Sequence, residues 1–132
     1  MPRHPQVYAA LLGEYLDRYR ARVFLVNTGW SGGPYGEGER IDIRLTRAMV
    51  DAALAGELER VEWREDPRFH LLVPRECPGV PPAVLWPRDI WRDPKDYDRR
   101  AEALAQQFRH HFQAAFSGQD IPEEVAAQCP GR

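Results

Sequence analysis

Residues 22–45 read RVFLVNTGWSGGPYGEGERIDIRL, and this stretch decides the fold class that the sequence predicts. It opens with a continuous apolar run at 22–27, which is typical of a strand buried on both faces of a parallel sheet. A glycine-rich loop follows, and residues 41–45 then alternate apolar and polar side chains as a strand does. The order of these segments predicts an α/β fold.

Two long segments with apolar residues at three- and four-residue spacing lie on either side of this stretch. They cover 4–20 and 94–116, and each spacing predicts an amphipathic helix. Asp93 can cap the second helix, Pro94 suits its first position, and Gly118 is placed to end it. We therefore expect 22–27 to be a central strand flanked by these two helices.

A shorter helix is predicted at 46–55, directly after the alternating segment. Thr46 is a plausible N-cap and Gly56 a plausible residue just past the C-terminus. The predicted apolar face of this helix consists of Met49, Val50, Ala53 and Leu54.

The second half of the chain is less regular before its final helix. Weak alternation at 60–64 and 69–73 predicts a short hairpin. Residues 74–94 hold six of the twelve prolines, so we expect an ordered loop without regular structure. Trp86 and Trp91 are expected to anchor this loop by burying aromatic surface. Residues 119–132 are predicted to form a polar tail with at most one short turn.

Composition excludes several classes of function. Among the 132 residues 43% are hydrophobic and 29% charged, the balance of a soluble folded chain of one domain. A net charge of −2 does not suggest a nucleic-acid-binding surface. The longest apolar run near the N-terminus, 7–12, is too short for a membrane span or a secretory signal. Cys77 and Cys129 are far apart, which favours a reduced, cytoplasmic chain.

The glycine-rich loop admits two interpretations. Gly32, Gly33, Gly36 and Gly38 directly follow an apolar run, as glycines do in phosphate-binding loops. Such loops end in glycine, lysine and a hydroxyl residue, whereas this one ends in Gly38, Glu39 and Arg40, and Lys95 is the single lysine of the chain. The composition therefore favours a turn that needs glycine for unusual backbone angles.

The remaining reactive side chains do not form a catalytic or metal-binding pattern. His4 and His70 stand alone, and His110 and His111 diverge by about 100° on a helix, so they cannot share a metal. Neither cysteine has a neighbouring base, and no pair of carboxylates stands out as an acid and base.

A resemblance to a known family extends over nearly the whole chain. Its core is residues 25–59, LVNTGWSGGPYGEGERIDIRLTRAMVDAALAGELE. Further matching positions are His4-Pro5, Asp66-Pro67-x-Phe69, Val73-Pro74, Pro78-Gly79-Val80-Pro81, Leu85-x-Pro87-Arg88, Trp91-x-Asp93, Tyr97-Asp98, Ala101, Leu104-Ala105, Phe108 and Phe112. In these strings the chain resembles the C-terminal segment of the ATP-dependent phosphoenolpyruvate carboxykinases.

The resemblance implies a fold and an activity for the complete enzyme. Family members convert oxaloacetate and ATP to phosphoenolpyruvate, ADP and CO2 with Mg2+ and Mn2+. The resemblance also implies that 1–118 is the C-terminal part of a mononucleotide-binding, mixed-sheet domain and that 119–132 is a tail. The family's phosphate loop, metal ligands and oxaloacetate-binding residues precede this segment and have no counterpart here.

Three residues are implied as ATP contacts by the resemblance: Arg40, Ile41 and Thr46. A guanidinium can stack on adenine, isoleucine can pack against the ring, and a threonine hydroxyl can bond a base or ribose edge. From the residues alone, a helix N-cap is the favoured explanation of Thr46.

Two functions are therefore expected. The first is a segment of the carboxykinase that contributes part of the adenosine-binding wall and is inactive by itself. The alternative is a non-catalytic remnant, or one subunit of a split enzyme, that acts as an interaction module through an unpaired sheet edge.

Overall fold

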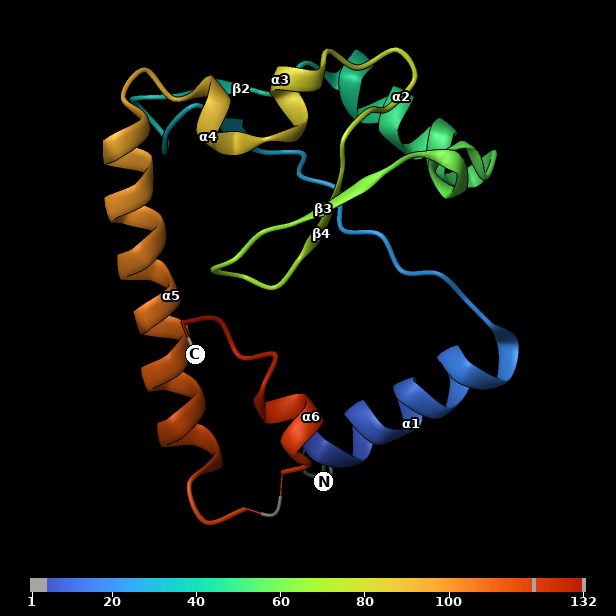
Figure 1. Cartoon of the computed structure of the whole chain (residues 1–132), viewed down its shortest axis with the longest axis vertical. Helices are drawn as coiled ribbons and strands as arrows, with labels where there is room; N and C mark the ends of the chain where they lie inside the picture. Colours follow the sequence, from blue (N-terminus) through green and yellow to red (C-terminus); the bar gives the residue numbers. More distant parts are fainter. Residues whose placement is uncertain (1–4, 120, 132) are drawn as a thin grey trace.

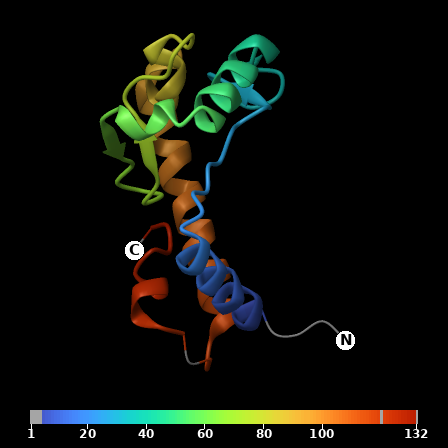
Figure 2. The same cartoon turned by 90° about the vertical axis from the view of Figure 1, so that its right-hand side faces the viewer.

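The computed structural model describes residues 5–119 and 121–131. The elements in chain order are α1 (Pro5–Tyr19), β1 (Trp30–Ser31), β2 (Glu39–Arg40), α2 (Ile43–Leu54), the 3-10 helix η1 (Glu57–Arg60), β3 (Trp63–Glu65), β4 (Leu72–Pro74), α3 (Pro82–Leu85), α4 (Pro87–Ile90), α5 (Pro94–Phe116) and α6 (Glu123–Ala126). In Figure 1, α5 runs down one side, α4 lies beside its first turns, and α3 and then α2 follow across the same end of the molecule. Figure 2 shows α1 and α6 at the opposite end.

The predicted central strand at 22–27 is wrong for this chain. The segment is extended, but it belongs to neither of the two small antiparallel sheets, β1–β2 and β3–β4. Val23 and Leu25 are 64% and 80% exposed, so the helices α1 and α5 do not enclose this segment. A strand buried on both faces needs neighbours along its edges, and the described residues supply none. The part of the fold prediction that is confirmed is the mixture of helices with small sheets.

The first helix is confirmed from Pro5 to Tyr19, and the expected His4 lies outside the described residues. None of its residues is buried, although its apolar stripe forms as the spacing predicts. No surface formed by the described residues therefore buries the apolar face of α1.

The predicted strand at 41–45 and the predicted N-cap at Thr46 are both wrong. The Asp42 carboxylate accepts from the backbone N–H of Arg44 at 2.8 Å, and this Asx turn starts α2 at Ile43. Thr46 lies one turn inside the helix, where its N–H donates to the Asp42 carbonyl oxygen at 3.2 Å. An aspartate can satisfy free helix N–H groups, and this overrides the short alternation around it.

The face of α2 that packs inward agrees only in part with the predicted one, because Met49 and Ala53 pack against the core but the other two predicted residues do not. Ala52 is buried, whereas Val50 and Leu54 are exposed. The predicted end of the helix is confirmed, because Gly56 adopts a left-handed φ of 69°.

The buried core lies beneath α2. Its buried members are Ala52, Leu58, Cys77 and Val80. Half-buried Phe24 packs against this cluster and stacks on Trp63 with ring centroids 6.3 Å apart. The core thus joins α2, η1, the hairpin strand β3 and the loop before α3.

The predicted hairpin is confirmed, with Trp63 opposite Pro74 and Glu65 opposite Leu72. The expectation of no regular structure at 74–94 is wrong, because α3 and α4 lie there. Pro82 and Pro87 occupy the first helical positions, where the missing N–H costs nothing.

Trp86 and Trp91 are half-buried and anchor this region as predicted. The Arg64 guanidinium carbon lies 3.1 Å from the centroid of the Trp86 ring, and Trp91 meets Tyr97 edge-on at 5.6 Å. These contacts join α4 to β3 and to α5.

The last long helix begins and ends as predicted. The Asp93 carboxylate accepts from the Lys95 N–H at 2.9 Å, and Gly118 follows the helix with a φ of 77°. Ala101 and Ala105 are buried, but Leu104 and Phe108 are about half exposed. The tail forms one short helix, α6, in agreement with the expected single turn.

Candidate functional site

The glycine-rich loop connects β1 and β2 and places the predicted ATP contacts. Trp30 pairs with Arg40 and Ser31 with Glu39, so the two strands form a very short hairpin. Gly32 and Gly36 have φ values of 74° and 88°, which disfavour residues with a Cβ. A Cβ at Gly38 would collide with the carbonyl oxygens of Gly33 and Ser31. The glycines are thus explained by the turn, as the composition favoured.

Arg40, Ile41 and Thr46 lie on either side of Asp42 at the start of α2. Arg40 ends β2 and is exposed, and its side chain forms no ion pair within the described part of the chain. The Ile41 N–H donates to the Gly29 carbonyl oxygen at 2.9 Å, and its side chain is half-buried. Thr46 is also half-buried, on the first turns of α2. The structure therefore gathers all three around one helix N-terminus.

The charge at this helix N-terminus is already compensated. Arg44 donates to Asp42 through Nε at 2.9 Å and through a terminal nitrogen at 2.5 Å. Hydrogen bonds from the Arg44 side chain and backbone lower the pKa of Asp42 to about 2. Arg44 therefore neutralises this carboxylate.

An ion pair connects the glycine turn to α5. Arg100 donates to the Glu37 carboxylate at 2.7 Å and to the Asp96 carboxylate at 3.0 Å. The same guanidinium lies 5.3 Å from the centroid of the Trp91 ring. These groups are partly exposed, so the pair adds less to stability than to the orientation of the turn.

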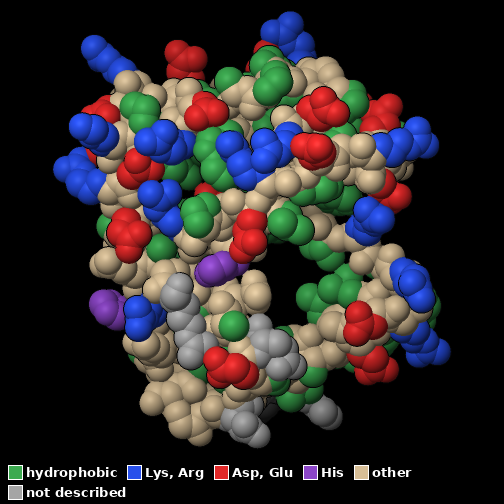
Figure 3. All heavy atoms as spheres, viewed as in Figure 1, with side chains coloured by type: hydrophobic (Ala, Val, Ile, Leu, Met, Phe, Trp, Pro, Cys, Tyr) green, Lys and Arg blue, Asp and Glu red, His purple; other side chains and the backbone are tan. Residues whose placement is uncertain are grey.

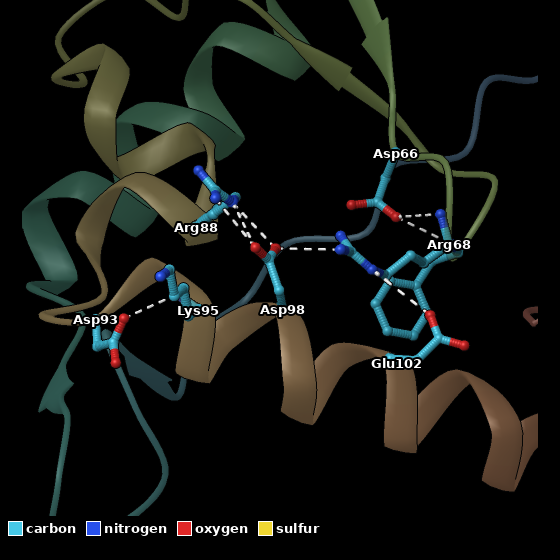
Figure 4. Close-up of polar contacts among 8 residues, drawn as sticks. Asp66, Arg68, Arg88, Asp93, Lys95, Asp98 and Glu102 are labelled. Carbon is cyan, nitrogen blue, oxygen red and sulfur yellow. Dashed lines mark hydrogen bonds and ion pairs between the residues drawn. The ribbon is translucent and has the colours of Figure 1, made fainter.

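A second ion-pair cluster surrounds Asp98 on α5, as Figure 4 shows. Arg88 of α4 donates to Asp98 at 3.0 Å, and Arg68 of the hairpin turn donates to it at 3.1 Å. The hydrogen bond from Arg88 lowers the pKa of the Asp98 carboxyl. Buried Asp66 accepts the backbone N–H groups of Arg68 and Phe69, both at 2.9 Å. The cluster therefore holds three elements together, although its members are not identified by any local sequence signal.

The described residues do not fit a bound divalent metal. Within 5–119 and 121–131, no group of three or more His, Cys, Asp or Glu side chains is arranged to hold an ion. His110 and His111 are exposed on α5, and Cys77 and Cys129 are buried free thiols. Burial raises the pKa of the Cys77 thiol, which makes it a poor nucleophile. In the described part of the chain, no helix combines the length and apolar character that a membrane crossing requires.

His70 is the least satisfied polar side chain of the hairpin. It adopts a left-handed φ of 54°, and its Nδ1 lies 3.4 Å from a carboxylate oxygen of Glu65. Its Nε2 is buried without a hydrogen-bond partner among the described residues. His70 is also one of the residues that line an open apolar groove between the hairpin, residues 22–27 and α5.

The chain is similar to one family over most of its length. The model of the phosphoenolpyruvate carboxykinase family matches residues 1–83. Proteins named phosphoenolpyruvate carboxykinase (ATP) from Caldanaerobacter subterraneus subsp. tengcongensis and Thermus thermophilus are 51% and 49% identical over 98% of this chain. A Moorella thermoacetica protein of the same name, numbered 1, is 53% identical over 95% of it.

Each of these relatives is much longer than the present chain. The chain spans 24%, 24% and 23% of their respective lengths, and the match falls in their C-terminal part. Both the family match and the identity extend over the β1–β2 turn, α2 and the core described above. The chain therefore belongs to the ATP-dependent phosphoenolpyruvate carboxykinase family and corresponds to its C-terminal quarter.

Proposed function

We propose that this chain supplies part of the adenosine-binding wall of an enzyme that converts oxaloacetate and ATP to phosphoenolpyruvate, ADP and CO2 in gluconeogenesis. The observation that carries the proposal is the exposed guanidinium of Arg40, which forms no ion pair with another described residue and lies beside Ile41 at the start of α2. Family membership supports it, because relatives that match nearly the whole chain are named for this ATP-dependent enzyme.

Each of the three residues has a distinct role in the proposal. Arg40 stacks on one face of adenine, where a cation gains energy from the π-system. Ile41 packs against the edge of the ring, and the Thr46 hydroxyl exchanges hydrogen bonds with the base or ribose. The glycine turn holds Arg40 in place before the nucleotide arrives, which reduces the entropic cost of binding.

The proposed domain assignment places 1–118 in the C-terminal part of a mononucleotide-binding domain of a cytoplasmic enzyme, with 119–132 as its tail. The tail folds back onto this part, since the Gly131 N–H donates to the Arg68 carbonyl oxygen at 3.2 Å. This contact supports a tail that closes one side of the domain.

The chain alone is proposed to be inactive. Phosphoryl transfer depends on cations positioned around the phosphates. Lys95 is the single lysine of the chain, and it lies in the first turn of α5 rather than at the end of a phosphate-binding loop. Mg2+ and Mn2+ serve the reaction only when the rest of the enzyme supplies their ligands, because the described residues do not gather any.

The substitution Arg40→Ala in an intact carboxykinase that contains this segment tests the proposal. Contacts to adenosine persist through phosphoryl transfer, so their loss acts on ground state and transition state alike. We expect KM for ATP to rise about 5- to 30-fold, which corresponds to about 1–2 kcal/mol, with kcat little changed. Arg60→Ala is the matched control, since Arg60 is also exposed but lies on η1. An unchanged KM in the Arg40 variant refutes the assignment.

A further inference from the structure

The glycine turn, residues 32–38, is joined to α5 by one polar contact. The Glu37 carboxylate accepts from a terminal nitrogen of Arg100 at 2.7 Å. In the part of the chain that the structure describes, no other side-chain hydrogen bond or ion pair links this turn to another element. Inside the turn, the N–H groups of Glu37 and Gly38 donate to the Pro34 carbonyl oxygen at 3.0 and 2.9 Å. These internal bonds shape the turn, but they do not fix its place on the molecule.

The two halves of the turn differ in how they are held. Gly32 lies against α4, where an added Cβ would come within 3.4 Å of Ile90. Residues 34–37 are exposed, and they lead within three residues to Arg40 at the end of β2. The position of the half that precedes Arg40 therefore depends on the contact of Glu37 with α5.

Arg100 is held in place independently of the turn. Its Nε donates to the Asp96 carboxylate, one helical turn earlier, at 3.0 Å, and its guanidinium carbon lies 5.3 Å from the centroid of the Trp91 ring. The donors of a guanidinium form a rigid planar fork. Once Asp96 orients this fork, the direction of the nitrogen that bonds Glu37 is also set. Helix α5 thus offers the turn a partner that is already oriented.

The pair contributes little to overall stability. The side chains of Arg100 and Glu37 are 39% and 55% exposed, and solvent screens ion pairs of this kind. Figure 3 shows acidic and basic side chains mixed over the end of the molecule where α5 begins. Since loss of the pair leaves the fold intact, a role in placing the turn can be measured separately from a role in folding.

We propose that Glu37 and Arg100 are positioning residues for ATP binding, because their ion pair fixes the second half of the glycine turn and with it the guanidinium of Arg40. The inference rests on the proposed function, since it takes Arg40 as the residue that contacts adenine. Without the pair, nucleotide binding must also order the turn. That requirement weakens binding of ATP without acting on the chemical step.

Electrostatics alone predicts the opposite change in KM. ATP is an anion, so removal of a carboxylate near its site should strengthen the attraction and lower KM. Positioning predicts that removal of the Glu37 carboxylate raises KM. Glu39 is the matched control, because it lies on β2 beside Arg40, is exposed and forms no ion pair with another described residue. The direction of the change in KM therefore separates the two effects.

Glu37→Ala and Glu39→Ala are compared with the parent in an intact carboxykinase that contains this segment. We expect Glu37→Ala to raise KM for ATP about 2- to 5-fold, with kcat and melting temperature close to those of the parent. Glu39→Ala should leave KM unchanged or lower it. The inference is overturned by an unchanged KM in Glu37→Ala, by an equal rise in Glu39→Ala, or by a rise that comes with a fall in kcat and melting temperature.

Arg100→Ala tests the other partner of the pair. We expect it to raise KM by at least the same factor, and Glu37→Ala added to it should produce no further rise, since both changes remove one contact. If the effects of the two substitutions multiply, Glu37 does not act through Arg100 and the inference is overturned.

Amide hydrogen exchange in the isolated chain gives a readout that needs no nucleotide. Glu37→Ala is expected to speed exchange of the Gly38 and Ile41 amides about 2- to 5-fold, because their hydrogen bonds close the turn and the hairpin. The Ala55 amide, bonded at the C-terminus of α2, should exchange as in the parent. Equal exchange of the turn amides in both chains overturns the inference. An unchanged KM in the Arg40→Ala enzyme refutes the proposed function, whatever the turn amides do.

Discussion

Helices α1 and α2 carry similar apolar spacing but differ in what covers them. On α2, Ala52 is buried in a cluster with Leu58, Cys77 and Val80. On α1 no residue is buried, and Figure 1 shows this helix at a distance from α2. The difference teaches that helical spacing determines which face is apolar, whereas burial depends on a partner surface.

Of the substitutions that test this difference between α1 and α2, the one at Leu58 is expected to have the largest effect on stability. Leu58→Ala removes buried side-chain volume and should reduce the free energy of unfolding by about 2–4 kcal/mol. Leu12→Ala on α1 makes the same chemical change at a side chain that is 57% exposed. It should alter stability by less than about 0.5 kcal/mol. Urea unfolding of the isolated chain, followed by tryptophan fluorescence, measures both, and equal losses would break the comparison.

A smaller effect is expected at the Asp98 cluster. Asp98→Asn removes the carboxylate that joins Arg88 and Arg68, so α4 and the hairpin turn lose a shared contact with α5. The side chains are partly exposed, and solvent screens the pairs. The loss of stability should be smaller than for Leu58→Ala and should shrink in high salt.

Asp89→Asn is the control for the Asp98 variant, since Asp89 is exposed on α4 and forms no ion pair with another described residue. If the two variants unfold at the same urea concentration in low salt, the cluster does not hold the elements together.

The smallest effect concerns the N-cap of α2. The pKa of Asp42 lies at about 2 in the folded chain, below its ordinary value of 3.8. A lowered folded-state pKa stabilises the fold at pH values above 3.8, and this contribution is lost as the pH falls toward 2. Asp42→Asn keeps a good cap but does not titrate. Circular dichroism between pH 5 and pH 2 should show an advantage of the parent chain that disappears over this window.

An identical pH profile for the parent chain and the Asp42 variant contradicts the role of this carboxylate. The other acidic residues titrate in both proteins, so the difference between the two curves isolates Asp42.

The features that the sequence predicts correctly are local ones. The cap at Asp93, the left-handed Gly56 and the hairpin at 63–74 each depend on residues within a few positions of one another. Their hydrogen bonds close inside the segment, so they form whatever surrounds them.

The features that the sequence predicts wrongly depend on distant partners or on competing local bonds. The run at 22–27 has strand character, but the strands that would pair with it are not among the described residues. The segment 41–45 alternates as a strand does, yet the Asx turn at Asp42 starts a helix inside it. For the candidate site, the resemblance implied Arg40, Ile41 and Thr46, and whether they contact a nucleotide stays a prediction.

The ion pairs were not predicted at all. Arg68 and Asp98 are thirty residues apart, and Glu37 and Arg100 are sixty-three apart. Such pairs follow from the tertiary arrangement, and a single sequence does not mark which of many charges will meet.

Titration of the isolated chain with Mg-ATP, followed by calorimetry, tests the central claim most directly. If the chain supplies one wall that touches about ten ligand atoms, the gain is about 3 kcal/mol. We therefore predict a dissociation constant in the millimolar range or weaker, and no phosphoenolpyruvate formed above a protein-free control. Micromolar binding, or turnover by the chain alone, would contradict the account that this segment acts only as part of a larger enzyme.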